Sequence, residues 1–287
     1  MKVRFLPFLM LPILGMAQAN SNGEIPLDGN TSSEKQTLEI KRNASFNLDE
    51  IKVRWKKAAL ENCTGVPCVV TPPAPSFTCG TSTISDVDNN VYETVSIGNQ
   101  CWTKQNLKVS MYNDGTLIPE ITSPGTWYSI GTAARTVYND LPANLSTYGY
   151  LYNWYAAAGI ITGGGLSTKN ICPTGWHVPS DPDWTTLIEF HGGIIGNIST
   201  LINASAKMKQ RGTTLWNNPN NGTDDFGFTA LPGGQRYLSG FIGLKSETKF
   251  WSANGGIFAS YVWIESGPTG IFMEVKERGF SIRCLRD

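Results

Sequence analysis

The sequence is poor in charged side chains and in histidine. Asp, Glu, Lys and Arg make up 16% of the 287 residues, whereas soluble domains usually contain about 25%. There are two histidines, so a His-rich metal centre is excluded, and any Ser/His/Asp arrangement has to use His177 or His191. The formal net charge is zero and basic blocks are absent. Nucleic-acid binding is therefore not expected, because it needs clustered Lys and Arg.

Motifs that define several large enzyme classes are also missing. The chain contains no GxGxxG dinucleotide motif, no P-loop and no nucleophile elbow. The carboxylate pairs Asp181/Asp183 and Asp224/Asp225 fall at an expected helix start and an expected turn, which are common structural locations. Glycine is plentiful instead, with 30 residues. This composition is typical of a loop-rich extracytoplasmic protein.

Residues 1–19 have the pattern of a secretory signal peptide. Lys2 and Arg4 precede an apolar run of about a dozen residues, and an Ala-Gln-Ala cleavage site ends at residue 19. The run is too short to cross ~30 Å of hydrocarbon, and two prolines interrupt it. No later apolar stretch reaches the length of a membrane span. We therefore expect an exported chain without a transmembrane segment, in oxidising surroundings where all six cysteines can pair.

The sequence predicts three segments between the signal peptide and the main domain. Residues 20–46 are polar and poorly patterned, and we expect them to be disordered or weakly extended. Residues 47–61 predict a short amphipathic helix that begins with a capping box at Asn47. This helix either docks on a partner or an anionic surface, or it is a short helix that lies on the main domain or is only partly formed. Residues 62–76 form a proline-rich, semi-rigid linker, which places a domain boundary near Ser76.

Residues 77–287 form the main domain, in which short β-type runs alternate with turns rich in Gly, Asn and Pro. Two helices are predicted, an aromatic one at 148–159 and a second at 180–190 with Ser180 as its N-cap. An alternating strand is predicted at 91–97. The later expected strands are 226–231, 249–253, 260–265, 271–275 and 279–285. Glycine pairs at 192, 233 and 255 are interpreted as turns. Helices followed by short strands favour an irregular, loop-rich α+β domain.

Seven sequence blocks in this region occur in an order that closely resembles the Fibrobacter succinogenes major paralogous domain family. The blocks are VSIGNQCWTKQNLKV, YNDGTLIP, YGYLYNWYAA, ICPTGWHVPSDPDWTTL, DDFGFTALPGGQR, FWSAN and GFSIRCLRD. The resemblance covers about residues 77–287 and implies a secreted bacterial module with a C-type-lectin-like fold, akin to that of formylglycine-generating sulfatase-modifying enzymes. It implies little about biochemical role.

The six cysteines allow fifteen pairings, and the sequence alone does not choose among them. The resemblance implies bridges Cys79–Cys101 and Cys172–Cys284, which leaves Cys63–Cys68. Formylglycine-generating enzymes use a cysteine pair near the end of the domain. This chain has one cysteine in that place, Cys284, and a catalytic thiol is not expected.

One loop begins as calcium-binding loops do. Asp86, Asp88 and Asn90 stand at alternate positions, but Val91 and Ile97 occupy the places where an EF-hand has Gly and Glu. The alternative is a polar turn ahead of the strand, which Asp and Asn favour. The Glu-Pro-Asn and Gln-Pro-Asp strings of sugar-binding C-type lectins are absent. We favour the turn and expect no metal or other cofactor.

The two histidines are expected to be structural. His177 lies just ahead of the second helix, and we expect a packed ring that bonds to backbone near the turn rather than a general base. His191 lies at the end of that helix, where it can interact with the terminal carbonyl groups.

The predicted functional surface is the segment 192–225, the longest stretch without a firm element. Our ligand-binding candidates are an exposed aromatic ring and three polar neighbours suited to a polar glycan: Trp216, Asn217, Lys209 and Arg211. In the alternative, residues 197–211 form a third helix and Trp216 is buried in the core. The other ambiguous aromatics are Trp127, Tyr128, Tyr237 and Trp263, of which we expect most to be buried.

These observations favour a secreted or cell-surface, non-enzymatic module that binds a glycan or a protein. One alternative is a structural component of a surface assembly, and a second is a relative of the formylglycine-generating oxidases.

Overall fold

The computed structural model describes residues 76–160 and 169–287. Contacts between residues divide the chain into two units, Met1–Pro75 and Ser76–Asp287, and the description below concerns the second. The predictions made for the signal peptide, the polar segment, the 47–61 helix, the linker and the Cys63–Cys68 pair lie outside the described residues.

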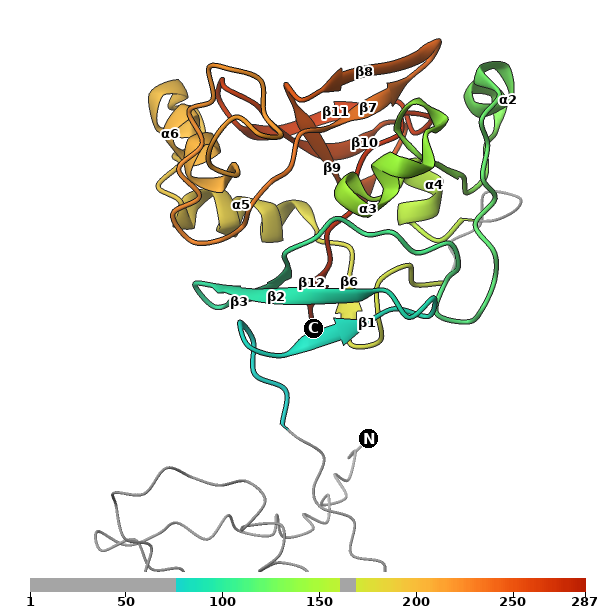
Figure 1. Cartoon of the computed structure of the whole chain (residues 1–287), viewed down its shortest axis with the longest axis horizontal. Helices are drawn as coiled ribbons and strands as arrows, with labels where there is room; N and C mark the ends of the chain where they lie inside the picture. The colour runs from blue at the N-terminus through green and yellow to red at the C-terminus, as the bar shows by residue number, and fades with distance from the viewer. Residues whose placement is uncertain (1–75, 161–168) are drawn as a thin grey trace, which may run out of the picture. The chain divides into compact units, whose positions relative to one another are not determined.

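Sheet 1 has the strand order β1-β2-β3-β12-β6 and is drawn at the bottom of the domain in Figure 1. Its members are β1 (Thr83–Ser85), β2 (Val91–Ile97), β3 (Gln100–Thr103), β6 (Trp176–His177) and β12 (Leu285–Arg286). The strand predicted at 91–97 is confirmed as β2. Gly98 takes a φ of 59° between β2 and β3, a conformation that glycine adopts at little cost. β12 comes from far along the chain, yet it lies between β3 and β6.

Sheet 2 has the order β11-β10-β9-β7-β8. Its strands are β7 (Gly233–Tyr237), β8 (Gly240–Leu244), β9 (Thr248–Gly255), β10 (Ala259–Ile264) and β11 (Gly270–Glu274). All neighbours are antiparallel except β7 and β9. The strands predicted at 249–253, 260–265 and 271–275 are confirmed within one or two residues at most ends. The prediction of a turn at the glycine pair 233–234 is wrong, because these residues begin β7.

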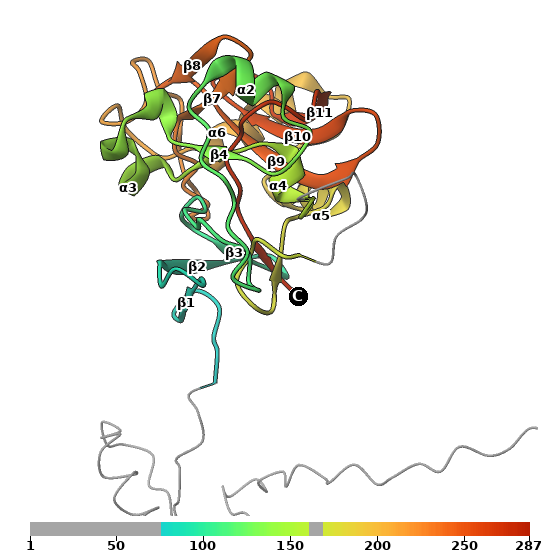
Figure 2. The same cartoon turned by 90° about the vertical axis from the view of Figure 1, so that its right-hand side faces the viewer.

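Two longer helices, α5 (Asp181–Phe190) and α6 (Ile198–Met208), pack beside sheet 2 (Figures 1 and 2). The helix predicted at 180–190 is confirmed as α5. Ser180 and Asp183 form a reciprocal capping box at its start. Trp184 stacks on Phe250 of β9 with ring centroids 5.6 Å apart. This contact belongs to a core that joins both helices to sheet 2 and to Trp102 of sheet 1.

The prediction of one helix over 148–159 is wrong. This region forms α3 (Leu145–Tyr148), β5 (Leu151–Tyr152) and α4 (Trp154–Ala157). Gly149, with a φ of 75°, passes so close to the chain that an added Cβ would stand 2.5 Å from the Leu107 carbonyl oxygen. The Tyr150 N–H donates to that same carbonyl. The chain is therefore held extended where local sequence favours a helix.

Shorter elements complete the domain. They are α2 (Pro124–Ser129), β4 (Arg135–Thr136), and the 3₁₀ turns η1 (Tyr138–Asp140) and η2 (Pro142–Asn144). β4 pairs with β5 in a small separate sheet.

Two further strand predictions are wrong in extent. Residues 226–231 form no strand, because Thr229 takes a φ of 54° and Ala230 makes a single bridge to Lys209. Of residues 279–285, the strand β12 includes Leu285 alone, and the preceding residues make isolated bridges to three other segments. The α+β class is as predicted: short helices combined with mostly antiparallel strands.

Candidate functional site

Both disulfides that the resemblance implied are present. Cys79 bonds Cys101 of β3, and Cys172 bonds Cys284, which directly precedes β12. No cysteine in the described part of the chain is free. The Cys284 sulfur is thus held in a fully buried bridge. Two bridges in one domain indicate an extracytoplasmic environment, because reducing compartments keep thiols unpaired.

The loop at Asp86 has the geometry of a polar turn. One carboxylate oxygen of Asp86 accepts from the backbone N–H groups of Asp88 and Asn90, at 3.0 and 2.9 Å. The other accepts from the Asn90 side chain and from the Tyr92 hydroxyl. Burial and this bond raise the pKa of Tyr92 far above its usual value. Both oxygens of Asp86 are thus engaged within the protein, as in the turn alternative.

His177 is not packed against backbone as predicted. Its ring is partly exposed, with Nδ1 2.6 Å from an Asp287 oxygen and Nε2 3.6 Å from an Asp183 oxygen. The reason is non-local, since β12 pairs with β6 and brings Asp287 beside the ring. His191 does interact with a terminal carbonyl, because its Nδ1 lies 2.8 Å from the Leu187 oxygen. Among the described residues, no group of three or more His, Cys, Asp or Glu side chains could hold a metal ion.

The prediction that Trp216 is exposed is wrong. Its side chain is 2% exposed, and its indole N–H donates to the Ala230 carbonyl at 3.1 Å. Lys209 is also fully buried, with Nζ 4.3 Å from the Trp216 ring centroid and 2.7 Å from Asn221 Oδ1. Burial lowers the pKa of Lys209 to about 8. The alternative is therefore correct in both parts: α6 forms a third helix and Trp216 fills the core.

The other two ligand-binding candidates do not form one site with the buried Trp216 and Lys209. Arg211 and Asn217 are exposed, and the Arg211 guanidinium bonds the Thr223 carbonyl. Their ligand contacts stay predictions. The prediction that most of the other ambiguous aromatics are buried is wrong: Trp127 is buried, Trp263 is half-buried, and Tyr128 and Tyr237 are exposed.

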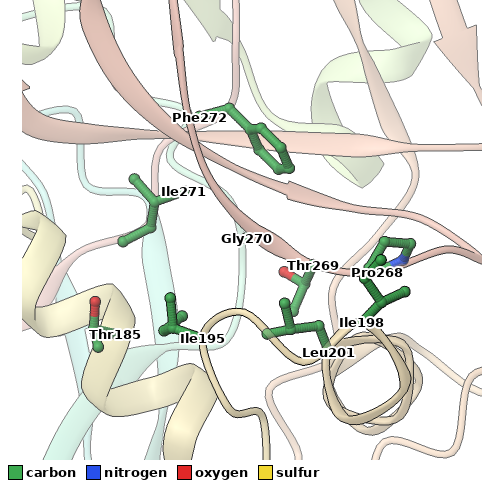
Figure 3. A pocket seen from close by; sticks show the side chains of 9 residues that line it. All are labelled: Thr185, Ile195, Ile198, Leu201, Pro268, Thr269, Gly270, Ile271 and Phe272. Atoms are coloured by element: carbon green, nitrogen blue, oxygen red, sulfur yellow. The ribbon is translucent and has the colours of Figure 1, made fainter.

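An apolar groove lies where the segment 192–225 meets the edge of sheet 2. It has a volume of about 390 Å³. Figure 3 shows the residues that line it from α5, the α5–α6 loop, α6, the β10–β11 loop and the strand β11: Thr185, Ile195, Ile198, Leu201, Pro268, Thr269, Gly270, Ile271 and Phe272. None of these side chains carries a charge. We call this surface the β11 groove.

The α5–α6 loop can form this wall because of its glycines. Gly192 takes a φ of 85°, and a Cβ on Gly193 would stand 2.6 Å from the Ile188 side chain. The chain therefore turns tightly over α5 before the Asn197 side chain caps α6. The turn leaves Ile194, Ile195 and Ile198 largely exposed, with Ile198 at 65%.

The polar groups of the groove already have partners. The Thr269 hydroxyl donates to the Trp263 carbonyl at 2.8 Å, and its backbone N–H donates to the Leu201 carbonyl. An occupant would therefore be held mainly by apolar contact, since few hydrogen-bonding groups remain to orient a polar molecule.

The predicted segment 192–225 contributes Ile195, Ile198 and Leu201 to the groove, and none of the four ligand-binding candidates lines it. Trp216 was favoured within this segment because its neighbours are polar. The informative signal was the string GGIIGNI at 192–198, in which three isoleucines lie among three glycines. Met273, 73% exposed at the rim strand β11, gave no sequence signal because it lies in an apolar run.

No helix in the described ranges is long and apolar enough to cross a membrane. A family model for the Fibrobacter succinogenes major domain matches residues 95–286, a range that includes α5, α6 and all of sheet 2. No curated protein and no solved structure matches the chain.

Proposed function

Since the chain belongs to the Fibrobacter succinogenes major domain family, for which no biochemical role is defined, we propose a function from its surface: an exported, non-enzymatic module that binds a protein partner through the β11 groove. The observation that carries this proposal is the gathering of exposed Ile195, Ile198 and Phe272 in an uncharged groove. Large exposed apolar patches on soluble proteins mark sites of interaction.

A protein is favoured over a glycan as the ligand. Sugar sites combine a flat aromatic platform with several hydrogen-bonding side chains. The groove offers Phe272 as its one aromatic residue, and two threonines. Aliphatic side chains instead complement the apolar anchors of a polypeptide.

Export is supported by the signal-peptide pattern of residues 1–19 and by the two disulfides. A cell-surface or periplasmic location and a C-type-lectin-like fold are part of this proposal. The curled antiparallel sheets, the two packed helices and the Cys172–Cys284 bridge are compatible with that fold. The absence of catalysis is likewise proposed, supported by the engagement of Cys284 in a bridge.

Site-specific photocrosslinking in the producing cells tests this function. A photoreactive phenylalanine analogue replaces Ile195 in the groove. In a matched control it replaces Ile242, an exposed isoleucine on the opposite edge strand β8. We expect light-dependent adducts of polypeptide mass at position 195 and none at 242. Adducts to lipid or glycan, or equal labelling at the two positions, would contradict a protein-binding groove.

A further inference from the structure

The two edges of sheet 2 differ in how they are covered. At β8, the Tyr138 hydroxyl of η1 accepts from the Leu244 N–H at 3.4 Å, and the Tyr138 and Phe241 rings pack 5.2 Å apart. β11 is the opposite edge, and within residues 76–160 and 169–287 it pairs with β10 alone. Alternate residues of β11 therefore direct backbone N–H and C=O groups away from the sheet.

The sequence of β11 does not protect this edge. Soluble proteins usually protect edge strands with lysine, proline, a bulge or a very short strand. β11 reads Gly-Ile-Phe-Met-Glu and has five residues. Its one charge, Glu274, lies 3.4 Å from Arg278 of the same chain. Phe272 and Met273 are both exposed. Such a strand is suited to pairing with another strand.

β11 forms part of the groove wall and also carries a side chain, Met273, of the kind that could fill such a groove. Side chains alternate along β11, so Ile271 and Met273 share the face that packs on α5 and α6. The Phe272 ring packs against Tyr261 and Trp263 on the other face and reaches the groove at its rim. Ile271 lines the groove (Figure 3). Met273, beyond it, is the most exposed residue of the strand, and methionine adapts readily to irregular apolar gaps.

Antiparallel pairing of two β11 strands about Phe272 brings these features together. Position numbers of opposed residues then sum to 544, so Met273 of one copy stands opposite Ile271 of the other, at the mouth of its groove. Gly270 stands opposite Glu274, which keeps the two carboxylates apart. Each copy gives and receives the same contact, as a closed two-fold interface requires.

We propose that the occupant of the β11 groove is a second copy of this chain, joined by antiparallel β11 strands centred on Phe272, with Met273 of each copy seated in the groove of the other. This inference rests on the proposed function, because it names the protein partner of the same surface. The pairing joins sheet 2 of one copy to sheet 2 of the other in one continuous sheet. It covers the exposed β11 edge of each copy.

Sedimentation of the purified chain tests the pairing. We expect a monomer–dimer equilibrium. Met273→Glu should weaken it at least tenfold, because a carboxylate would enter an uncharged groove. Ile242→Glu on β8 places the same change on the covered edge and should leave the equilibrium unchanged. A chain that stays monomeric, or a dimer indifferent to Met273→Glu, overturns the proposal.

Engineered cysteines test the register. Directly opposed residues lie about 4.5–5.5 Å apart between Cα atoms, within disulfide range. Phe272→Cys should therefore form a covalent dimer on oxidation. Met273→Cys should not, because its own counterpart lies about 8 Å away, displaced by two residues. Cross-linking of neither variant, or of Met273→Cys alone, overturns the pairing.

The two proposals can fail separately. A monomeric chain whose position 195 still crosslinks to a different polypeptide in cells retains the protein-binding function and refutes the second copy. Absence of any polypeptide adduct refutes both.

Discussion

Sheet 1 and sheet 2 are stabilised in different ways, although they share one domain. The strands of sheet 2 lie within one stretch of sequence, between Gly233 and Glu274, and each has five to eight residues. The strands of sheet 1 come from three distant stretches, and two of them have two residues each. Both disulfides attach to sheet 1, at Cys101 and Cys284, and sheet 2 contains no cysteine. Bringing together the distant stretches of sheet 1 costs more loop-closure entropy, and sheet 1 is the sheet that carries the disulfides. Sheet 2, whose strands are close in sequence, relies on packing.

The largest expected effect is the loss of the long-range bridge of sheet 1. Cys172 and Cys284 are 112 residues apart, and chain entropy assigns such a bridge about 4.7 kcal/mol. Cys172→Ala with Cys284→Ala should lower the free energy of unfolding in urea by about that amount. The control pair, Cys79→Ala with Cys101→Ala, has a separation of 22 and should cost about 3 kcal/mol. A larger loss of unfolding free energy in the control pair would show that loop length does not determine how much each bridge stabilises sheet 1.

The next largest effect tests how much the packing around Trp216 stabilises the domain. Trp216→Ala should lower the free energy of unfolding by about 4 kcal/mol, because a buried ring and its bond to Ala230 are lost. Ile242→Ala on the exposed face of β8 should change it by less than about 1 kcal/mol. A small effect of Trp216→Ala in thermal or urea unfolding would mean that packing around this ring contributes little.

The third prediction uses pH to measure the cost of burying Lys209. Its pKa is lowered to about 8 by burial, so between pH 8 and about 10.4 the unfolded chain binds more protons than the folded one. Stability due to this group should therefore rise with pH across that window, by at most about 3 kcal/mol. Below pH 8 the full penalty is present.

Lys209→Met should remove this rise. The difference in unfolding free energy between wild type and variant is the quantity to follow, because the buried tyrosines titrate alike in both proteins. A difference that stays constant from pH 7 to pH 10 would contradict the assignment.

The smallest effect concerns α5, which packs between the two sheets. Ser180→Ala removes the side-chain oxygen that accepts from the Asp183 N–H and breaks the capping box. We expect a loss of about 1 kcal/mol. Thr186→Ala on the exposed side of the same helix is the control, with little change expected. Equal losses in the two variants would show that the cap does not anchor the helix.

Features set by neighbouring residues were predictable, and features set by distant contacts were not. The capping residues Ser180 and Asp183 identify α5, and alternation identifies β2, because both signals are local. The extended chain after Gly149 depends on Leu107, about forty residues away. Trp216 has polar neighbours in sequence, yet Lys209 and Ala230 enclose it. The pairing of cysteines followed from the family resemblance rather than from spacing.

The place of β12 affects how the domain can be made. β12 lies between β3 and β6, and Cys284 stands directly ahead of it. Until residues 284–286 have been synthesised, β3 and β6 have no strand to join them, and Cys172 lacks the thiol of Cys284 as its partner. Sheet 1 therefore cannot be completed progressively as the chain emerges. If the chain is exported as proposed, this delay would keep the domain open during passage through a narrow channel, which a closed domain would block.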